Sequence, residues 1–377
     1  MAAPPAGHDK RLFTPGPLST SPTVKAAMLR DLGSRDAEFL GVVKKVRAAL
    51  LRIAGVAEPD YTSLPLQGSG TYAVEAALGA LLPTGGRILV AQNGAYGQRI
   101  AQLSRAQGLQ VTPCDFAESD PVDPAAIDAL LAADSGLAAV ALVHCETSTG
   151  QVNPVSAVAE RCRARGRRLL IDAMSSFGAL PCPLSEWGAD ALVTSANKCL
   201  QGVPGLALIV AKREILRAAQ GQARSVSLDL CAQLAGLDRD GQFRFTPPVH
   251  ALLALHQALV ELDQEGGPAA RLRRYQANQQ RLLAGMTALG FRTFLPEALL
   301  SPIITSFLLP AQPGFDFPAF YRGLSDRGCV IYPGKVSRAD CFRIGTIGDL
   351  HPDDVDHLLH AIAEVLHAQG LPVPLPA

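Results

Sequence analysis

Two observations predict an α/β fold, in which a large domain with a mostly parallel sheet is joined to a smaller α+β domain. Apolar strand-like segments alternate with helical segments between about residues 70 and 211. This pattern is typical of parallel strands with helices on both faces of the sheet. After about residue 250, long helical segments replace the alternation. We therefore place the large domain at 21–265 and the small domain at 1–20 and 266–377.

The elements of the large domain follow from hydrophobic periodicity and from stop signals. Helices end at Gly108 and Gly166, and Asp123-Pro124 gives a cap followed by a first-turn proline,. In chain order we expect helix 72–82, strand 87–91, helix 96–107, strand 109–113, a helix from 124 to about 133, strand 138–145, a helix from 154 to Gly166, and strands 168–172, 192–196 and 206–211.

The small domain begins after a strong helix-breaking signal. A helix over 250–265 stops at Gly266-Gly267-Pro268,. We then expect helix 269–289, strand 302–308, helix 317–327, strand 330–332, the segment CFRIGTIG and helix 353–368. The first nine residues and the tail LPVPLPA are expected to fray.

Bulk composition excludes several classes of protein. The 377 residues carry 34 basic and 34 acidic side chains, and no basic block stands out, so neither nucleic acid nor a membrane is an expected partner. The N-terminus lacks a signal-peptide pattern, and the eight scattered cysteines contain no Cys-x-x-Cys pair. We expect a cytoplasmic protein with reduced thiols and no metal site.

Polar residues follow three predicted strands, at Glu146-Thr147, Asp172 and Lys198. In parallel sheets, ligands bind outside the carboxyl ends of the strands, so these residues should meet in one crevice. A lysine and an acid so placed suit pyridoxal 5'-phosphate: the amine holds the aldehyde as a Schiff base and moves a proton, and the acid keeps the ring nitrogen protonated. The alternative for Asp172 is a salt bridge to Arg167 or Arg168.

Other segments supply further candidates, each with an alternative interpretation. The turn Ser69-Gly70-Thr71 enters a helix and can bind a phosphate, or can simply start that helix,. Tyr96 can stack on a ring or pack as an ordinary aromatic residue. Arg343 can clamp a substrate anion or form a surface ion pair. His144 and Glu146 can hold their loop in shape.

Together, motifs from about residue 12 to 365 resemble one family. These are TPGPLSTSPTV, LQGSGTYAVEAAL, QNGAYGQR, HCETSTG, IDAMSSFG, TSANKCLQGVPG, FTPPVH, SPIITSF, VIYPGK and CFRIGTIG. They are similar to the 2-aminoethylphosphonate–pyruvate transaminases, which belong to the class V group of fold-type I pyridoxal-phosphate aminotransferases.

The resemblance implies a role for each candidate residue. Lys198 would carry the cofactor, Asp172 would pair with its ring nitrogen, Tyr96 would stack on the ring and Thr147 would contact the ring oxygen. Ser69, Gly70 and Thr71 would bind the phosphate. A homodimer with active sites at its interface is implied, with Thr246 reaching the phosphate of the neighbouring subunit's cofactor. Gly16 would line the substrate entrance through its backbone, and Arg343 would clamp the substrate anion.

The implied reaction belongs to phosphonate catabolism. It converts 2-aminoethylphosphonate and pyruvate to phosphonoacetaldehyde and L-alanine. The alternatives are alanine– or serine–glyoxylate or –pyruvate aminotransferases, and a cysteine desulfurase, which would need a nucleophilic cysteine on a mobile loop. The segment LGSRDAEF at 32–39 departs from the family pattern near the expected substrate mouth, and Arg35 is either a second anion-binding group or a surface charge.

Overall fold

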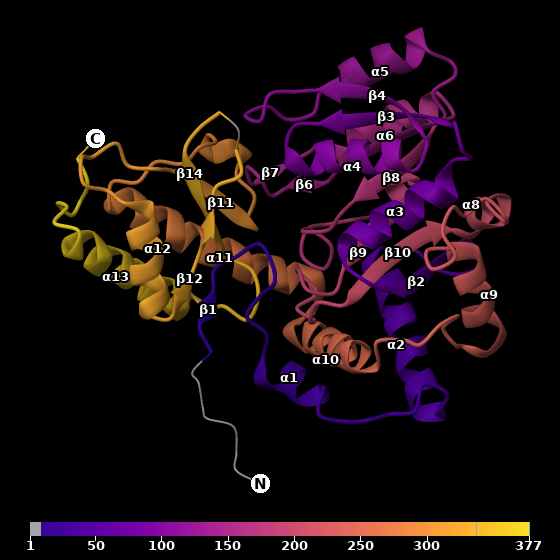
Figure 1. Cartoon of the computed structure of the whole chain (residues 1–377), viewed down its shortest axis with the longest axis horizontal. Helices are drawn as coiled ribbons and strands as arrows, with labels where there is room; N and C mark the ends of the chain where they lie inside the picture. Colours follow the sequence, from indigo (N-terminus) through magenta and orange to yellow (C-terminus); the bar gives the residue numbers. More distant parts are fainter. Residues whose placement is uncertain (1–8, 337, 377) are drawn as a thin grey trace.

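A seven-stranded sheet forms the centre of the larger part of the molecule (Figure 1). The computed structural model describes residues 9–336 and 338–376. In spatial order the sheet contains β2 (Tyr61–Gln67), β10 (Leu206–Lys212), β9 (Ala191–Ser195), β8 (Arg168–Asp172), β5 (Ala139–Val143), β3 (Arg87–Gln92) and β4 (Gln110–Asp115). Strand β10 is antiparallel to both of its neighbours, and the other pairings are parallel. The predicted α/β fold with a mostly parallel sheet is confirmed.

Helices cover both faces of this sheet because alternate strand residues point in opposite directions. In β8, Ile171 belongs to the core on one face and Leu170 to the core on the other. The first core includes α2 (Ala37–Ile53), α5 (Pro124–Ala133), α6 (Val155–Ala164), α7 (Leu184–Trp187) and α10 (Val249–Glu265). The second includes α3 (Gly70–Leu81), α4 (Ala95–Ala106), α8 (Arg213–Ala218) and the start of α9 (Leu230–Asp240). Helix α1 (Pro22–Ala27) lies against α10.

A third core, which we call the small-domain core, lies beside the large sheet in the orange and yellow part of Figure 1. Its antiparallel sheet has the order β11 (Ile304–Leu308), β14 (Cys341–Gly345) and β13 (Tyr332–Pro333). Helices α11 (Gly267–Ala288), α12 (Phe317–Asp326) and α13 (Pro352–Ala368) and the 3-10 turn η1 (Glu297–Leu299) complete it. The N-terminal strand β1 (Arg11–Leu12) pairs with β12 (Cys329–Val330), so the chain's start joins this part.

Proline explains why one strand of the large sheet was not predicted. Strand β2 has the sequence YTSLPLQ, in which Pro65 and three polar residues hide the strand pattern. Because proline cannot donate to a strand ladder, it is confined to sheet edges. Strand β2 is one edge strand and β4, which contains Pro113, is the other.

Three other predictions need correction. The predicted strand 138–145 is interrupted at His144, where β5 ends and the short hairpin of β6 (Cys145–Glu146) and β7 (Gln151–Val152) begins. The predicted strand 330–332 is divided between β12 and β13. The tail that was expected to fray is packed, because Leu371 and Leu375 are buried and Leu375 N–H donates to the Leu289 carbonyl at 2.9 Å. Residues 1–8 of the other predicted frayed end lie outside the described residues.

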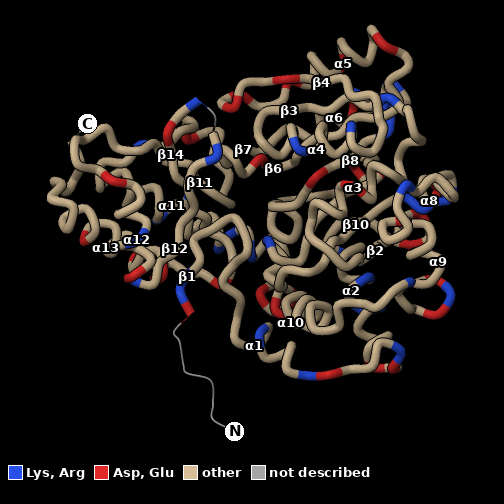
Figure 2. Tube along the Cα trace, viewed as in Figure 1, with Lys and Arg blue, Asp and Glu red and all other residues tan. Residues whose placement is uncertain are grey.

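Charged side chains are spread over the molecule. Figure 2 shows lysine and arginine interspersed with aspartate and glutamate along the trace. In the described part of the chain, no helix combines the length and the apolar character needed to span a bilayer.

Candidate active site

The predicted strand-end residues meet at one cavity of about 660 Å³. Asp172 closes β8, Lys198 follows β9, and the first turns of α3 and α4 face them across the cavity. The lining residues are Ser69, Gly70, Thr71, Val74, Tyr96, Arg99, Ile100, Leu103, Asp172, Met174, Ser195, Asn197 and Lys198. Six predicted site residues from four separate segments are therefore brought together.

Asp172 is a buried carboxylate without a cation. Its side chain is 6% exposed, and Oδ1 accepts a hydrogen bond from the Met174 N–H at 2.9 Å. Burial raises the pKa of Asp172 to about 6,. Among the described residues it forms no ion pair, and Arg168 instead donates to the Leu81 carbonyl. The salt-bridge alternative with Arg167 or Arg168 is therefore wrong, and the carboxylate can accept a positive group from the cavity.

Lys198 lies against the N-terminal segment. Its Nζ donates to the Pro15 carbonyl at 2.8 Å and lies 3.5 Å from the Gly16 carbonyl oxygen. Burial lowers the pKa of Lys198, which increases the neutral, nucleophilic fraction of the amine. Gly16 has φ +120°, and a Cβ there would lie 2.5 Å from Lys198 Cδ. Glycine is required at this position because the backbone lies directly on the lysine side chain.

The N-terminus of α3 opens onto the same cavity. Ser69 is the N-cap, and its side chain makes no capping hydrogen bond. A Cβ on Gly70 would lie 2.0 Å from Met174 Sδ, so only glycine allows Met174 to pack against this turn. Free backbone N–H groups and the helix dipole favour an anion here.

Glu146 fixes the start of α4 and with it Tyr96. The Glu146 carboxylate is fully buried and accepts hydrogen bonds from the N–H groups of Tyr96 at 3.1 Å and Gly97 at 3.2 Å. The Ser148 hydroxyl and the Ser148 N–H also donate to it, at 2.6 and 3.2 Å. Four donors around one carboxylate give Glu146 the loop-holding role that the sequence left open.

Cations from two directions approach the Tyr96 ring. Arg99 Cζ lies 4.9 Å from the ring centroid and Lys335 Nζ lies 4.3 Å from it. Burial alone would raise the pKa of the Tyr96 phenol, but the charges of Lys335, Lys198 and Arg343 and a hydrogen bond with Thr147 together lower it. The mouth of the site is therefore electropositive.

Arg343 joins the smaller sheet to the loop that carries Thr147. It lies on β14, is 5% exposed, and donates to the Thr147 carbonyl at 2.9 Å and to the Pro333 carbonyl at 3.1 Å. No carboxylate among the described residues pairs with it, so the alternative of a surface ion pair is wrong. A guanidinium has five N–H groups, and those without a carbonyl partner can bind an anion.

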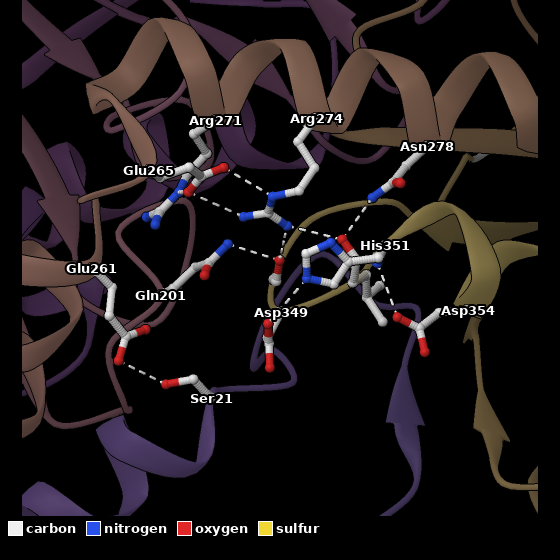
Figure 3. A network of polar contacts seen from close by, with 12 residues as sticks. Ser21, Gln201, Glu261, Glu265, Arg271, Arg274, Asn278, Asp349, His351 and Asp354 are labelled. Atoms are coloured by element: carbon white, nitrogen blue, oxygen red, sulfur yellow. Dashed lines mark hydrogen bonds and ion pairs between the residues drawn. The ribbon is translucent and has the colours of Figure 1, made fainter. Parts of the chain in front are cut away.

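Helix α11 holds the loop that follows Lys198 (Figure 3). The buried Arg271 donates to the Cys199 carbonyl at 2.9 Å and pairs with Glu265 at 2.9 Å. Arg274, one turn further along α11, binds the same Glu265 at 2.8 Å. Sequence reasoning missed these residues, although two arginines three positions apart on one helix face were a usable signal.

Gln201 and Tyr275 continue this network toward the segment after β14. The Gln201 side chain donates to the Tyr275 hydroxyl at 2.6 Å and to the Gly348 carbonyl at 2.7 Å. The Gly348 N–H in turn donates to the Tyr275 hydroxyl at 3.2 Å. The lysine loop and the end of the strand that carries Arg343 are thus bonded to the same side chain.

One predicted site residue lies apart from the others. Thr246, between α9 and α10, is exposed and is not among the residues that line the cavity. Phe245 beside it is 54% exposed. Its predicted contact with a neighbouring subunit's cofactor stays a prediction.

Known proteins resemble this chain over nearly its whole length. The family model described as "Aminotransferase class-V" matches residues 21–312. A 2-aminoethylphosphonate–pyruvate transaminase of Syntrophobacter fumaroxidans is 49% identical over 360 residues, which cover 95% of this chain and 97% of the relative. One of Aeromonas hydrophila is 50% identical over 374 residues and 98% of each chain.

Solved structures show the same fold. An alanine–glyoxylate aminotransferase from Nostoc sp. is 26% identical, has a TM-score of 0.87, and is matched over 97% of this chain and 98% of its own. A ureidoglycine–glyoxylate aminotransferase from Bacillus subtilis superimposes with a TM-score of 0.89 at 24% identity, over 99% of this chain and 96% of its own.

Proposed function

The chain belongs to the class V aminotransferase family, and from this premise we propose that it transfers the amino group of 2-aminoethylphosphonate to pyruvate. The products are phosphonoacetaldehyde and L-alanine, which places the reaction in phosphonate catabolism. Support comes from relatives of that name at about half identity over nearly the full length. The observation that carries the proposal is the pair of Lys198 and Asp172, a half-buried lysine and a buried carboxylate without a cation partner at one cavity.

The residues fit pyridoxal 5'-phosphate. Asp172 is a buried acid that needs a positive partner,, and the N-terminus of α3 offers N–H groups to a phosphate,. When bound, this cofactor supplies an aldehyde and an electron-accepting ring. In this proposal Lys198 holds the aldehyde carbon, Asp172 holds a proton at the ring nitrogen, and residues 69–71 bind the phosphate.

The remaining residues position the ring and the substrate. Tyr96 would pack against the cofactor ring, and Thr147 would contact the ring oxygen. With the cofactor bound, Lys198 Nζ would be the base that moves the proton of the substrate carbon bearing the amine. Arg343 binds the anionic end of the amino donor and then of pyruvate. Gly16 lines the entrance through its backbone.

The two-domain division is part of the proposal. Helix α10 ends at Glu265, and Gly266, with φ +104°, separates it from α11. The pairing of β1 with β12 joins the start of the chain to the small-domain core. Both observations support a large domain at 21–265 and a small domain at 1–20 and 266–377.

We further propose a cytoplasmic homodimer with shared active sites. All eight cysteines are free thiols, which suits a reducing compartment. Tyr72, next to the phosphate turn, and Phe245, next to Thr246, are 50% and 54% exposed. Large exposed aromatic residues suit a protein interface, and a second copy would bring its own Thr246 to the phosphate.

Donor and acceptor preference tests the proposed reaction. The purified holoenzyme is mixed with 2-aminoethylphosphonate, L-alanine or L-serine, and the fall in cofactor absorbance gives the rate of each half-reaction. Acceptors are compared with pyruvate and glyoxylate. We expect the phosphonate amine and pyruvate to give the highest kcat/KM. A preference for alanine or serine with glyoxylate would instead establish the alternative aminotransferase.

A further inference from the structure

We propose that Lys335 is the second cation for the phosphonate group, and that together with Arg343 it makes the site select a doubly charged anion over a carboxylate. The inference rests on the proposed function and deepens it. Lys335 is the last residue of the motif VIYPGK, and no role could be predicted for this lysine from the sequence.

Lys335 lies over the Tyr96 ring and forms no ion pair with the carboxylates of the described residues. It follows β13 and is half-buried, and its Nζ lies 4.3 Å from the centroid of the Tyr96 ring. No carboxylate within residues 9–336 and 338–376 forms an ion pair with it. A cation over the face of an aromatic ring is attracted only weakly where water reaches it. This weak contact keeps the ammonium at the mouth of the site and leaves it available to an anion.

Strand pairing brings Arg343 to the same place. Tyr332 of β13 is paired with Arg343 of β14, and Arg343 Nε donates to the Pro333 carbonyl at 3.1 Å. Lys335 follows Pro333 by two residues. The two cations therefore come from adjacent segments of one sheet, and backbone hydrogen bonds fix the arginine.

The electrostatic effect on Tyr96 supports this placement. Burial would raise the pKa of the Tyr96 phenol, yet the phenol's pKa is lowered, and Lys335 is the strongest of the three charges responsible. Lys198 and Arg343 supply the others. Three basic side chains thus act on one hydroxyl, and the ion pairs formed by the described residues include none of the three.

The charge of the ligand then decides which cations are used. A carboxylate carries one charge, and a single guanidinium fork satisfies its two oxygens. A phosphonate, like a phosphate group, has three oxygens and gains a second charge above a pH of about 6. Arg343 alone matches the carboxylate of pyruvate or alanine, whereas the phosphonate also uses Lys335. Both substrates can thus share Arg343 and still be distinguished.

Half-reaction kinetics of Lys335 variants test this inference. In holoenzyme carrying Lys335→Met we expect kcat/KM for 2-aminoethylphosphonate to fall roughly 10- to 100-fold, and kcat/KM for L-alanine to change less than about 3-fold. Lys335→Arg should restore most of the loss. The matched control is Lys44→Met, which removes one charge from the exposed face of α2 and should change neither rate.

Binding of simple anions gives a second readout that needs no turnover. Methyl phosphate and acetate are titrated into the holoenzyme by calorimetry at pH 5.5 and pH 8, conditions that bracket the second ionisation of a phosphate monoester at about 6. In the wild-type protein the preference for methyl phosphate over acetate should grow at the higher pH, and Lys335→Met should lose this growth. An equal loss for both anions, or no loss for either, would overturn the inference.

The two readouts separate failure of this inference from failure of the proposed function. If the wild-type holoenzyme reacts with L-alanine but not with 2-aminoethylphosphonate, the proposed reaction is wrong, and anion binding still reports on Lys335. If the wild-type protein uses the phosphonate amine and Lys335→Met uses it equally well, only the role of Lys335 is wrong.

Discussion

The two ends of the site differ in charge. We call Asp172 and Lys198 the floor of the site, and Arg343 and Lys335 its mouth. At the floor, the ionised forms of Asp172 and Lys198 have opposite charges. Burial raises the pKa of Asp172 and lowers the pKa of Lys198, which favours the neutral form of each side chain. At the mouth, Arg343 and Lys335 carry the same charge, and together with Lys198 and a hydrogen bond with Thr147 they outweigh the effect of burial on the pKa of Tyr96. The floor therefore suits a cofactor that carries a positive ring nitrogen and an aldehyde and remains bound. The mouth suits substrate anions, which bind and are released in each turnover.

The largest effect should come from the floor. Lys198→Ala removes the amine that holds the aldehyde and moves the proton, so we expect both half-reactions to fall by about 10⁴-fold or more. Borohydride reduction of the holoenzyme should attach a pyridoxal group to the wild-type protein and none to the variant, as measured by mass spectrometry. Lys44→Ala is the control. Near-normal turnover by Lys198→Ala would disprove the assignment.

At the mouth, Arg343→Met should impair both substrates alike. The buried guanidinium is the cation shared by the two anions, so we expect kcat/KM for 2-aminoethylphosphonate and for pyruvate each to fall roughly 100-fold. Steady-state kinetics with each substrate varied in turn measure this. A loss confined to one substrate would remove the distinction between Arg343 as the common clamp and Lys335 as the selective one.

The buried acid of the floor should appear in the pH dependence of stability. The folded chain raises the pKa of Asp172 from 3.8 to about 6, so the folded state binds this proton more tightly. The resulting stabilisation is full below a pH of about 4 and is lost as the pH rises through about 6. In cofactor-free protein we expect the unfolding free energy of wild type minus that of Asp172→Asn to fall by about 2 kcal/mol between pH 4 and 7.

Denaturant unfolding of the two proteins at each pH measures this difference. Burial lowers the pKa of His144 to about 4, but His144 is present in both proteins and its titration cancels. Pyridoxal 5'-phosphate should restore stability to the wild-type protein at pH 7 more than to the variant. A difference that does not change with pH would show that Asp172 has a cation partner in the folded chain.

The smallest effect is expected where floor and mouth are joined. Tyr275→Phe removes the hydroxyl that bonds Gln201 and Gly348, and the Gln201 amide keeps its bond to the Gly348 carbonyl. We expect about 1 kcal/mol of lost stability and a change of only a few-fold in kcat. Thermal unfolding and kinetics are compared with Tyr321→Phe, a half-buried tyrosine on α12. A loss of activity as large as that of Arg343→Met would mean that the hydrogen bonds of Tyr275 are needed for catalysis and not only for stability.

The residues of the floor could be predicted from the sequence more completely than those of the mouth. Asp172 and Lys198 stand at the ends of apolar strands, so local pattern and the geometry of parallel sheets place them together. At Arg343 the sequence left a surface ion pair open, because burial is not visible in a short motif. It gave Lys335 no role, since its meaning depends on Tyr96, which lies far away in the chain and close in space.

The order of charges, turns and apolar periods along the chain determined an α/β sheet and the strands whose ends carry the chemistry. Those signals are local, and a few neighbouring residues encode each of them. The tertiary structure alone decided that Asp172 has no cation partner among the described residues, that Arg271 binds the carbonyl of Cys199 beside Lys198, and that Arg99 and Lys335 both lie against the Tyr96 ring. These are contacts between distant segments, and packing of the cores, rather than any local preference, brings the segments together.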